Sequence, residues 1–173
     1  MLILQTERLN LRTITVDDAG FYLELVNDPS WIRYIGDRGL RTLEAAATAI
    51  VDGPVAMHDK LGYSLYVVER RSDGKAMGMC GLIKRDILPD TDIGYAISPQ
   101  FWGQGYAREA AGAVVAHARG PLGLRRLLAI TSPDNAASQK LLLKLGMGFV
   151  KRTKLEGWEE DSHLYKMEFV ANP

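Results

Sequence analysis

The stretch from Asp92 to Ala110 has residue types that could hold an anion with backbone groups. It reads as a strand, a turn with Gly103 and Gly105 after a proline, and then an amphipathic helix. The start of a helix carries about half a positive charge and several amides without a partner inside the helix. Glycine leaves these amides open, because a side chain would block the approach of a ligand. The spacing therefore predicts a pyrophosphate site made of backbone.

Two other phosphate-binding patterns do not fit the same stretch. A Rossmann fingerprint needs a third glycine where Arg108 stands, and an acidic residue about 20 positions further on, where Leu124 and Arg125 stand. A P-loop needs Gly-Lys-Ser or Gly-Lys-Thr, and the sequence contains neither. A plain turn at the start of a helix is the remaining alternative.

Charge is distributed unevenly along a chain whose total is zero, with 21 basic and 21 acidic residues. The segment 100–154 holds nine basic and two acidic residues, a net of +7, so the remainder carries −7. Four carboxylates, which we call the acidic segment, follow it: Glu156, Glu159, Glu160 and Asp161. This order suits a protein that holds an anionic ligand beside a cationic one, with the acidic segment attracting a cationic amine. The alternative is that the basic and acidic segments form two solvated faces that bind no ligand.

Strands and helices that alternate along the chain would position these groups. Period-two alternation and short apolar runs predict strands, and helical spacing with capping signals predicts helices. The expected strands are 8–14, 62–69, 75–87, 91–98, 127–131, 149–153 and 164–170, and the expected helices are one opened by Asp17 and Asp18, 45–51, 105–119 and 135–145. Asn27-Asp28-Pro29 should end the first helix, and Gly53-Pro54 the second. A mixed α/β fold with one sheet and helices on both faces follows.

Composition places the chain among ordinary folded domains. Its 173 residues fit one domain, and 47% apolar with 24% charged residues excludes a disordered or fibrous chain. Zero net charge gives no support for binding nucleic acid or an anionic membrane. The single cysteine, Cys80, permits no internal disulfide and no cysteine-based metal cluster, and we expect no metal. No secretory signal or membrane span is evident, so we expect a cytoplasmic protein.

Three motifs together resemble those of the GNAT N-acetyltransferase family. Trp102-Gly-Gln-Gly-Tyr-Ala107 and Asn135-Ala-Ala-Ser-Gln-Lys-Leu-Leu-Leu-Lys-Leu-Gly146 are similar to two family signatures. The opening Gln5-Thr-Glu-Arg-Leu-Asn-Leu-Arg12 resembles the branch that includes the ribosomal-protein alanine N-acetyltransferases (RimJ/RimL-like), and the resemblance spans residues 5 to 169. The sequence departs from the family pattern at Trp102, where Gln or Arg is usual, and in the stretch from Lys144 to Phe149, which is two residues longer.

The resemblance implies a single N-acetyltransferase domain over residues 1–173, with a mostly antiparallel sheet and a splayed pair of parallel strands at the coenzyme site. Acetyl-coenzyme A would be the co-substrate and a primary amine the acceptor. The strand 92–98 would bind pantetheine through its backbone, and the glycine turn would hold the pyrophosphate. The implied coenzyme-binding residues are Ala96, Ile97, Ser98, Trp102, Gly103, Gln104, Gly105, Tyr106, Ala107, Asn135 and Ser138.

Acetyl transfer to an amine needs a base for the amine and a proton donor for the departing thiolate. Ser138 shares a helical stripe with leucines, so its hydroxyl faces inward, and the resemblance puts it near the sulfur as the donor. A serine that bonds only to its own helix is the alternative. Asp92 is the candidate base, with a surface aspartate as the alternative. Tyr165 and His163 share one strand face and are reserve candidates for the acid and the base.

The resemblance favours a protein N-terminal amine, such as that of a ribosomal protein, which attacks directly in a ternary complex. A small-molecule amine (polyamine, amino acid or antibiotic) is an alternative acceptor, and a non-catalytic module that binds acetyl-coenzyme A is an alternative function. The sequence does not identify the acceptor, because acceptor loops vary. We expect a monomer or a homodimer.

Overall fold

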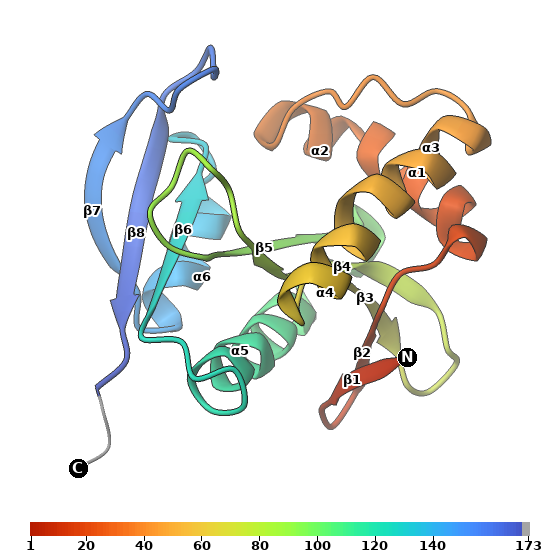
Figure 1. The fold of residues 1–173 in the computed structure, drawn as a ribbon, viewed down its shortest axis with the longest axis horizontal. Coiled ribbons are helices and arrows are strands. Elements are labelled where there is room, and N and C mark those ends of the chain that lie inside the picture. The colour runs from red at the N-terminus through yellow and green to blue at the C-terminus, as the bar shows by residue number, and fades with distance from the viewer. Residues whose placement is uncertain (171–173) are drawn as a thin grey trace.

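The computed structural model describes residues 1–170 and has one sheet of eight strands (Figure 1). Their order across the sheet is β1-β2-β3-β4-β5-β6-β8-β7, and every neighbouring pair is antiparallel except β5 and β6. The predicted fold class is therefore confirmed; the predicted domain span includes residues 171–173, which lie outside the described residues. The strands are β1 (Leu2–Gln5), β2 (Leu9–Arg12), β3 (Leu65–Arg70), β4 (Ala76–Ile83), β5 (Asp92–Ile97), β6 (Arg126–Thr131), β7 (Gly148–Thr153) and β8 (Ser162–Glu168).

The parallel strands β5 and β6 meet only near the start of β5. One Cα pair, Asp92 with Leu128, joins them, beside a hydrogen bond from Leu128 N to Thr91 O of 3.0 Å. On its other edge β5 pairs with β4 along its whole length. Figure 1 shows β6, β8 and β7 standing apart from the rest of the sheet. Beyond Asp92, the edge of β5 that is turned toward β6 therefore has no strand partner within residues 1–170.

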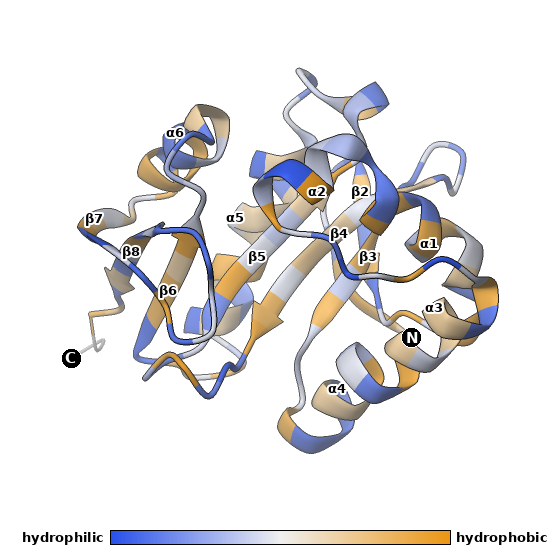
Figure 2. Ribbon diagram, turned by 90° about the horizontal axis from the view of Figure 1, so that it is seen from above, coloured by the Kyte–Doolittle hydropathy of each residue, from blue (hydrophilic) through white to orange (hydrophobic). Residues whose placement is uncertain are grey.

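Helices cover both faces of this sheet. The first group packs over a core that includes Val67 and Met79, and the second over a larger core that includes Leu82 and Leu127. Figure 2 shows the first group beside β2, β3 and β4, and α6 beside β6, β7 and β8. The first group is α1 (Ala19–Asn27), α2 (Pro29–Tyr34) and α3 (Leu43–Ile50), and the second is α5 (Tyr106–Arg119) and α6 (Ala136–Lys144). In α4 (Ala56–Leu61), His58 lies edge-on to Tyr66 of the larger core.

Alternation along β5 assigns its side chains to the two faces. Ile93, Tyr95 and Ile97 pack with the core beneath α5 and α6. Ala96 packs with the core beneath α1, α2 and α3. Asp92 has the same parity as Ala96, so its side chain projects toward the α2 face. One strand therefore presents groups to both sides of the sheet.

The helix α2 begins where the sequence predicts only the end of α1. Asp28 caps α2 by accepting a hydrogen bond from Ser30 N (2.9 Å), and Pro29 stands in its first turn. Proline fits there because the first amides of a helix have no partner inside it. The signal Asn27-Asp28-Pro29 thus ends one helix and opens another.

The predicted end of the second helix at Gly53-Pro54 is wrong. A π-helical turn over Val51–Val55 contains the proline and joins α3 directly to α4. Such a turn changes the hydrogen-bonding pattern locally, so one missing amide does not end the helix. The helix ends instead at Gly62, whose φ of +79° is unfavourable for other residues.

Strand boundaries differ from the prediction at several places, and β3 begins three residues later than predicted. The sequence predicts no strand before residue 8, yet β1 pairs with β2 across a bulge. β4 ends at Ile83, and the loop that follows packs Leu88 against Leu128 and Leu155 in a third small core. The last strand begins and ends two residues earlier than predicted. Within residues 1–170, no helix is both long and apolar enough to cross a membrane.

Candidate active site

A cleft of about 900 Å³ lies where β5 and β6 diverge. Its walls come from β5 and the turn after it, the start of α5, the end of β6 with the start of α6, and α2 with the loop that follows α2. The single Cα pair between β5 and β6 leaves this space open, whereas a complete parallel ladder would close it. The splay of the sheet therefore creates the cleft.

The glycine turn leaves the amides at the start of α5 without a cap. Gly105 (φ +81°) is the N-cap residue of α5, and Gly103 (φ +74°) shares its left-handed backbone. Glycine has no side chain to cap the amides of Tyr106, Ala107 and Arg108, and all five residues line the cleft. A Cβ added to Gly103 would meet no other atom within 4 Å. The turn therefore faces open space that an anion can occupy.

The turn between β1 and β2 neutralises the acidic side chain in the first turn of α5. Glu109 accepts hydrogen bonds from Thr6 Oγ1 (2.7 Å) and Arg8 N (2.9 Å), and pairs with Arg8 Nε (2.7 Å). Burial alone would raise the pKa of Glu109, but these hydrogen bonds outweigh burial and lower it. Arg8 also donates to Gln104 O (2.9 Å). Arg8 thus offsets a charge that would repel an anion, and it holds the glycine turn.

Most of the predicted coenzyme-binding residues line the cleft. Ser98 and Gln104 do not line it. Their backbone groups are engaged elsewhere: Ser98 N donates to Met77 O (2.8 Å) in β4, and Gln104 O accepts from Arg8. The lining residues are Ala96, Ile97, Trp102, Gly103, Gly105, Tyr106, Ala107, Asn135 and Ser138. Their binding roles stay predictions.

Trp102 ties the glycine turn to the end of β5. Its Nε1 donates to Ile97 O (2.6 Å), while its side chain remains half exposed. This bond occupies a carbonyl at the end of the strand and fixes where the turn begins. The Trp102 side chain therefore fixes the start of the glycine turn relative to the end of β5.

Tyr95 links β5 to the start of α6 through Ser138. The Tyr95 hydroxyl lies 2.8 Å from Ser138 Oγ and 3.2 Å from Ser138 O. Asn135 caps α6 by accepting from Ser138 N (3.2 Å). Burial raises the pKa of Tyr95, so its hydroxyl keeps its proton at neutral pH. Sequence reasoning missed Tyr95 because its alternation with Ile93 and Ile97 is also typical of a core side chain.

Asp92 lies at the closed end of the splay, and its side chain is 1% exposed. Its Oδ1 is 3.1 Å from Arg85 Nε. Burial raises the pKa of Asp92 to about 6, against the opposing effects of Arg85 and Lys84. The Arg85 guanidinium lies 5.6 Å from the ring centroid of Trp158. A buried carboxylate with this pKa on a cleft wall can act as a general base near neutral pH.

Tyr165 and His163 do not line the cleft. Tyr165 is buried beneath α6, paired with Ala129 across β6 and β8. Both rings meet Phe149 edge-on, and the buried Nδ1 of His163 has no hydrogen-bond partner in the described part of the chain. The structure therefore does not bring either side chain beside Asp92. Alternation identifies residues that share a strand face, but it does not say whether a core or a cleft covers that face.

The acidic segment also lies off the cleft wall. None of its four carboxylates lines the cleft, although Trp158 of the same loop does. Asp161 pairs with Arg152 of β7 (2.8 Å), and the three glutamates are exposed. The acidic segment thus borders the cleft through Trp158 without lining it, and its attraction of a cationic amine stays a prediction.

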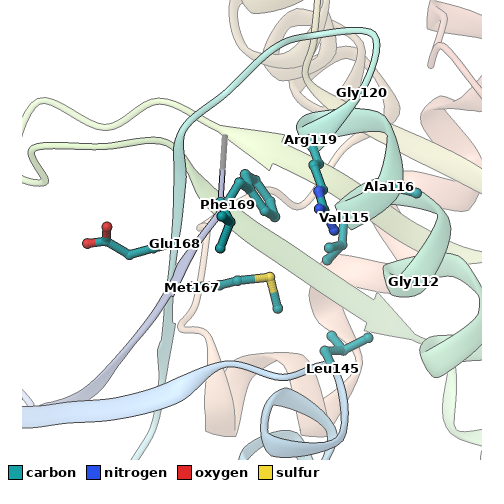
Figure 3. A pocket seen from close by; sticks show the side chains of 10 residues that line it. Gly112, Val115, Ala116, Arg119, Gly120, Leu145, Met167, Glu168 and Phe169 are labelled. Atoms are coloured by element: carbon teal, nitrogen blue, oxygen red, sulfur yellow. The ribbon is translucent and has the colours of Figure 1, made fainter. Parts of the chain in front are cut away.

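A second cavity, of about 560 Å³, lies between α5, the end of α6 and the end of β8. Figure 3 shows Val115 and Arg119 of α5 on one side and Met167 and Phe169 on the other. None of the predicted site residues lines it. In the described part of the chain, no group of three or more His, Cys, Asp or Glu side chains could hold a metal ion. Cys80 is buried, and burial raises the pKa of its thiol.

Comparison with known proteins identifies the family. The family model described as acetyltransferase (GNAT) domain matches residues 8–148. The protein therefore belongs to the GNAT acetyltransferases and is an acyltransferase. It is similar to the uncharacterized N-acetyltransferase YoaA of Bacillus subtilis, at 34% identity over 83% of this chain and 81% of the relative.

Two solved structures share the fold. One is RimL, a ribosomal L7/L12 alpha-N-protein acetyltransferase in complex with coenzyme A (TM-score 0.82, 19% identity, 97% of this chain and 98% of that chain). The other is the ribosomal-protein-S5-alanine acetyltransferase from Vibrio fischeri (TM-score 0.78, 21% identity, 95% of each chain). The resemblance to the RimJ/RimL-like branch is confirmed at the level of the fold.

Proposed function

We propose that this acetyltransferase moves the acetyl group of acetyl-coenzyme A to a primary amine by direct attack in a ternary complex. The observation that carries the proposal is that β5 presents two kinds of group to one cleft. Its carboxyl end leads into the open amides of α5, which suit an anionic coenzyme. Its first residue, Asp92, is a buried carboxylate on the α2 side, which suits removal of a proton from an amine.

The residues on the α5 side fit the coenzyme. Acetyl-coenzyme A supplies an activated acetyl group, and it carries a pyrophosphate and a chain with two amides. The amides of Tyr106, Ala107 and Arg108 would hold the pyrophosphate, with the Arg108 guanidinium as an added cation. The unpartnered edge of β5 would hydrogen-bond the amides of the chain in the manner of an added strand.

Asp92 is the proposed base, and Tyr95 with Ser138 the proposed proton donor. A carboxyl group with a pKa of about 6 is mostly ionised at pH 7, so Asp92 can accept a proton directly or through water. Tyr95 keeps its proton at this pH, and its hydroxyl is within hydrogen-bonding distance of Ser138 Oγ. Tyr95 therefore takes the role that the sequence suggested for Tyr165.

We propose a protein N-terminal amine as the acceptor class, a choice supported by the fold shared with RimL. A small free amine is the second candidate, supported by the almost complete burial of Asp92, which leaves little room around the reacting amine. The carboxylate and the hydroxyl pair on the cleft wall count against a non-catalytic coenzyme-binding module. The cytoplasm remains the proposed place of action.

Replacing the hydroxyl pair tests the proposal. Tyr95→Phe and Ser138→Ala should each lower kcat by about 10- to 1,000-fold, because the thiolate loses its proton donor. The KM for acetyl-coenzyme A should change little, because neither side chain is charged. The measurement is thiol release from acetyl-coenzyme A in the presence of a peptide amine.

Tyr63→Phe is the matched control, because the Tyr63 hydroxyl is buried on Thr91 (2.7 Å) and does not line the cleft. Its kcat should equal that of the wild type. Unchanged kcat in both Tyr95→Phe and Ser138→Ala, with normal coenzyme binding, would exclude the pair as the donor.

A further inference from the structure

Among residues 1–170, three cations on the cleft wall (Arg38, Arg108 and Lys144) and one carboxylate (Asp28) have no ion pair. This inference, which rests on the proposed function, concerns the acceptor. We propose that the acceptor carries a carboxylate close to its reacting amine, and that Arg38 binds this carboxylate. The proposal names one chemistry with two sources: a free amino acid, or a peptide N-terminus followed by an acidic side chain. The acidic segment had suggested the opposite charge for the acceptor.

Every carboxylate on the cleft wall already has partners. Asp28 accepts from Ser30 N (2.9 Å) and from Ser30 Oγ (2.5 Å) at the start of α2. Asp92 pairs with Arg85 (3.1 Å), and Asp134 pairs with Arg33 (3.5 Å) and accepts from the Ser132 hydroxyl. No other Asp or Glu among the described residues lines the cleft. Asp28 is therefore the one cleft-wall anion without an ion pair among residues 1–170, against three such cations, and this balance disfavours a polycationic acceptor.

Arg38 is an exposed cation on the cleft wall with no ion-pair partner among residues 1–170. Its neighbours hold it in position. Asp37 accepts from Gly39 N (2.8 Å) and pairs with Arg41 (2.7 Å), and Arg41 also donates to Asn27 Oδ1 (2.7 Å) at the end of α1. A guanidinium presented by an anchored loop suits recognition of a carboxylate.

Arg38 belongs to the same side of the cleft as Asp92. It follows α2, whose Trp31 packs with Ala96 in the core beneath α1, α2 and α3. Asp92 has the parity of Ala96 and projects to that face. The other unpaired cations on the wall, Arg108 and Lys144, belong to α5 and α6 on the opposite face. Arg38 is therefore the cation available to the acceptor, while Arg108 serves the coenzyme.

Two pairs of acceptors that differ in one negative charge test the proposal, and each KM is expressed per neutral amine, because a neighbouring carboxylate also raises the pKa of the amine. The peptides are Ala-Asp-Phe-Gly amide and Ala-Asn-Phe-Gly amide, and the free pair is alanine and alanine amide. For the wild type, the acceptor with the carboxylate should have a KM about three- to tenfold lower in at least one pair. The pair that shows this preference identifies the source. Both turnover and acceptor binding, read from the fluorescence of Trp31 and Trp158 on the cleft wall, should be measured.

Arg38→Ala should abolish the preference while leaving the KM for acetyl-coenzyme A unchanged. Arg119→Ala is the matched control, because Arg119 is an exposed cation that lines the second cavity instead of the cleft. It should retain the preference.

The outcomes separate the two proposals. Equal KM values within both pairs for an active wild type, or a preference that survives Arg38→Ala, would overturn the role of Arg38 and leave acetyl transfer standing. A fall in coenzyme affinity in Arg38→Ala, with no change in acceptor preference, would overturn it too. Binding that prefers the carboxylate and depends on Arg38, without any turnover, would support Arg38 while refuting the proposed function. Absence of both binding and turnover would refute both.

Discussion

Asp92 has neighbours with opposite effects on its ionisation. Its burial favours the neutral acid, while the Arg85 guanidinium favours the carboxylate, and burial is the larger effect. The resulting pKa of about 6 leaves the group ionised at neutral pH and more basic than an exposed carboxylate. Arg85 is itself held near Trp158 of the loop between β7 and β8. The contact between Arg85 and Asp92 therefore controls how readily the proposed base accepts a proton.

The pH dependence of turnover tests Asp92. Because only the ionised form accepts a proton, kcat should rise with pH through an ionisation near pH 6 that is separate from the ionisation of the acceptor amine at higher pH. Asp92→Asn should lower kcat by about 100- to 10,000-fold and remove this ionisation. Arg85→Met should move it to higher pH, because the cation that favours the carboxylate is gone. The measurement is kcat from about pH 5 to about pH 9 with one acceptor.

A pH dependence near 6 that persists in Asp92→Asn would assign the ionisation to another group. The acceptor amine titrates at higher pH, so its own ionisation should remain in both proteins and serves as the internal control.

Single residues were predictable where helical spacing or an apolar stripe fixed their direction. Ser138 was found in this way, because its leucine neighbours show which side of α6 is buried. Tyr95 was not found, because on a strand a polar group beside the coenzyme and a side chain in the core share the same alternation. Tyr165 was misplaced for the same reason: its strand face is covered by α6, and no local pattern reports which element covers a face.

At the level of elements, the start of α5 depends on a turn that only glycine adopts without strain. Gly105 has a φ of +81°, and a Cβ there would lie 3.4 Å from an Arg8 guanidinium nitrogen. The sequence predicted this turn and its open amides from the glycine spacing. It did not predict that Thr6 and Arg8 would hold the turn from the far edge of the sheet, because that contact joins residues about a hundred positions apart. Local sequence rules also did not predict that the chain stays helical through Pro54, in a π-helical turn.

Gly105→Ala and Gly123→Ala separate backbone strain from coenzyme binding. Both glycines have a positive φ (+81° and +60°), so each substitution should cost about 1–2 kcal/mol of stability. Only Gly105 lines the cleft, so Gly105→Ala alone should weaken acetyl-coenzyme A binding, by about tenfold or more for one or two lost amide contacts. Thermal unfolding and coenzyme titration of both variants check this. Equal coenzyme affinity in the two variants would show that the turn does not hold the coenzyme.

At the scale of the whole molecule, the splay between β5 and β6 divides one sheet into two parts and leaves the cleft between them. The helices α5 and α6 line the proposed coenzyme side, and α2 with its following loop lines the proposed acceptor side. Charge counts along the sequence predicted a basic segment for an anionic ligand, and two of its nine basic residues, Arg108 and Lys144, line the cleft. They did not predict that the carboxylates of the acidic segment lie off the cleft wall, because charges that are close in sequence can turn away from a site or pair with a neighbour, as Asp161 does with Arg152.

Transfer of an acetyl group from acetyl-coenzyme A to an amine is the central claim, and product analysis by mass spectrometry with parallel thiol titration tests it most directly. The protein should be mixed with acetyl-coenzyme A and the peptide Ala-Asp-Phe-Gly amide, with each also supplied alone. We predict that acetylated peptide and free coenzyme A form in equal amounts, that thiol release requires the amine, and that the protein itself gains no acetyl group. Thiol release at the same rate without any amine, or no acetylated peptide after complete loss of acetyl-coenzyme A, would contradict the account.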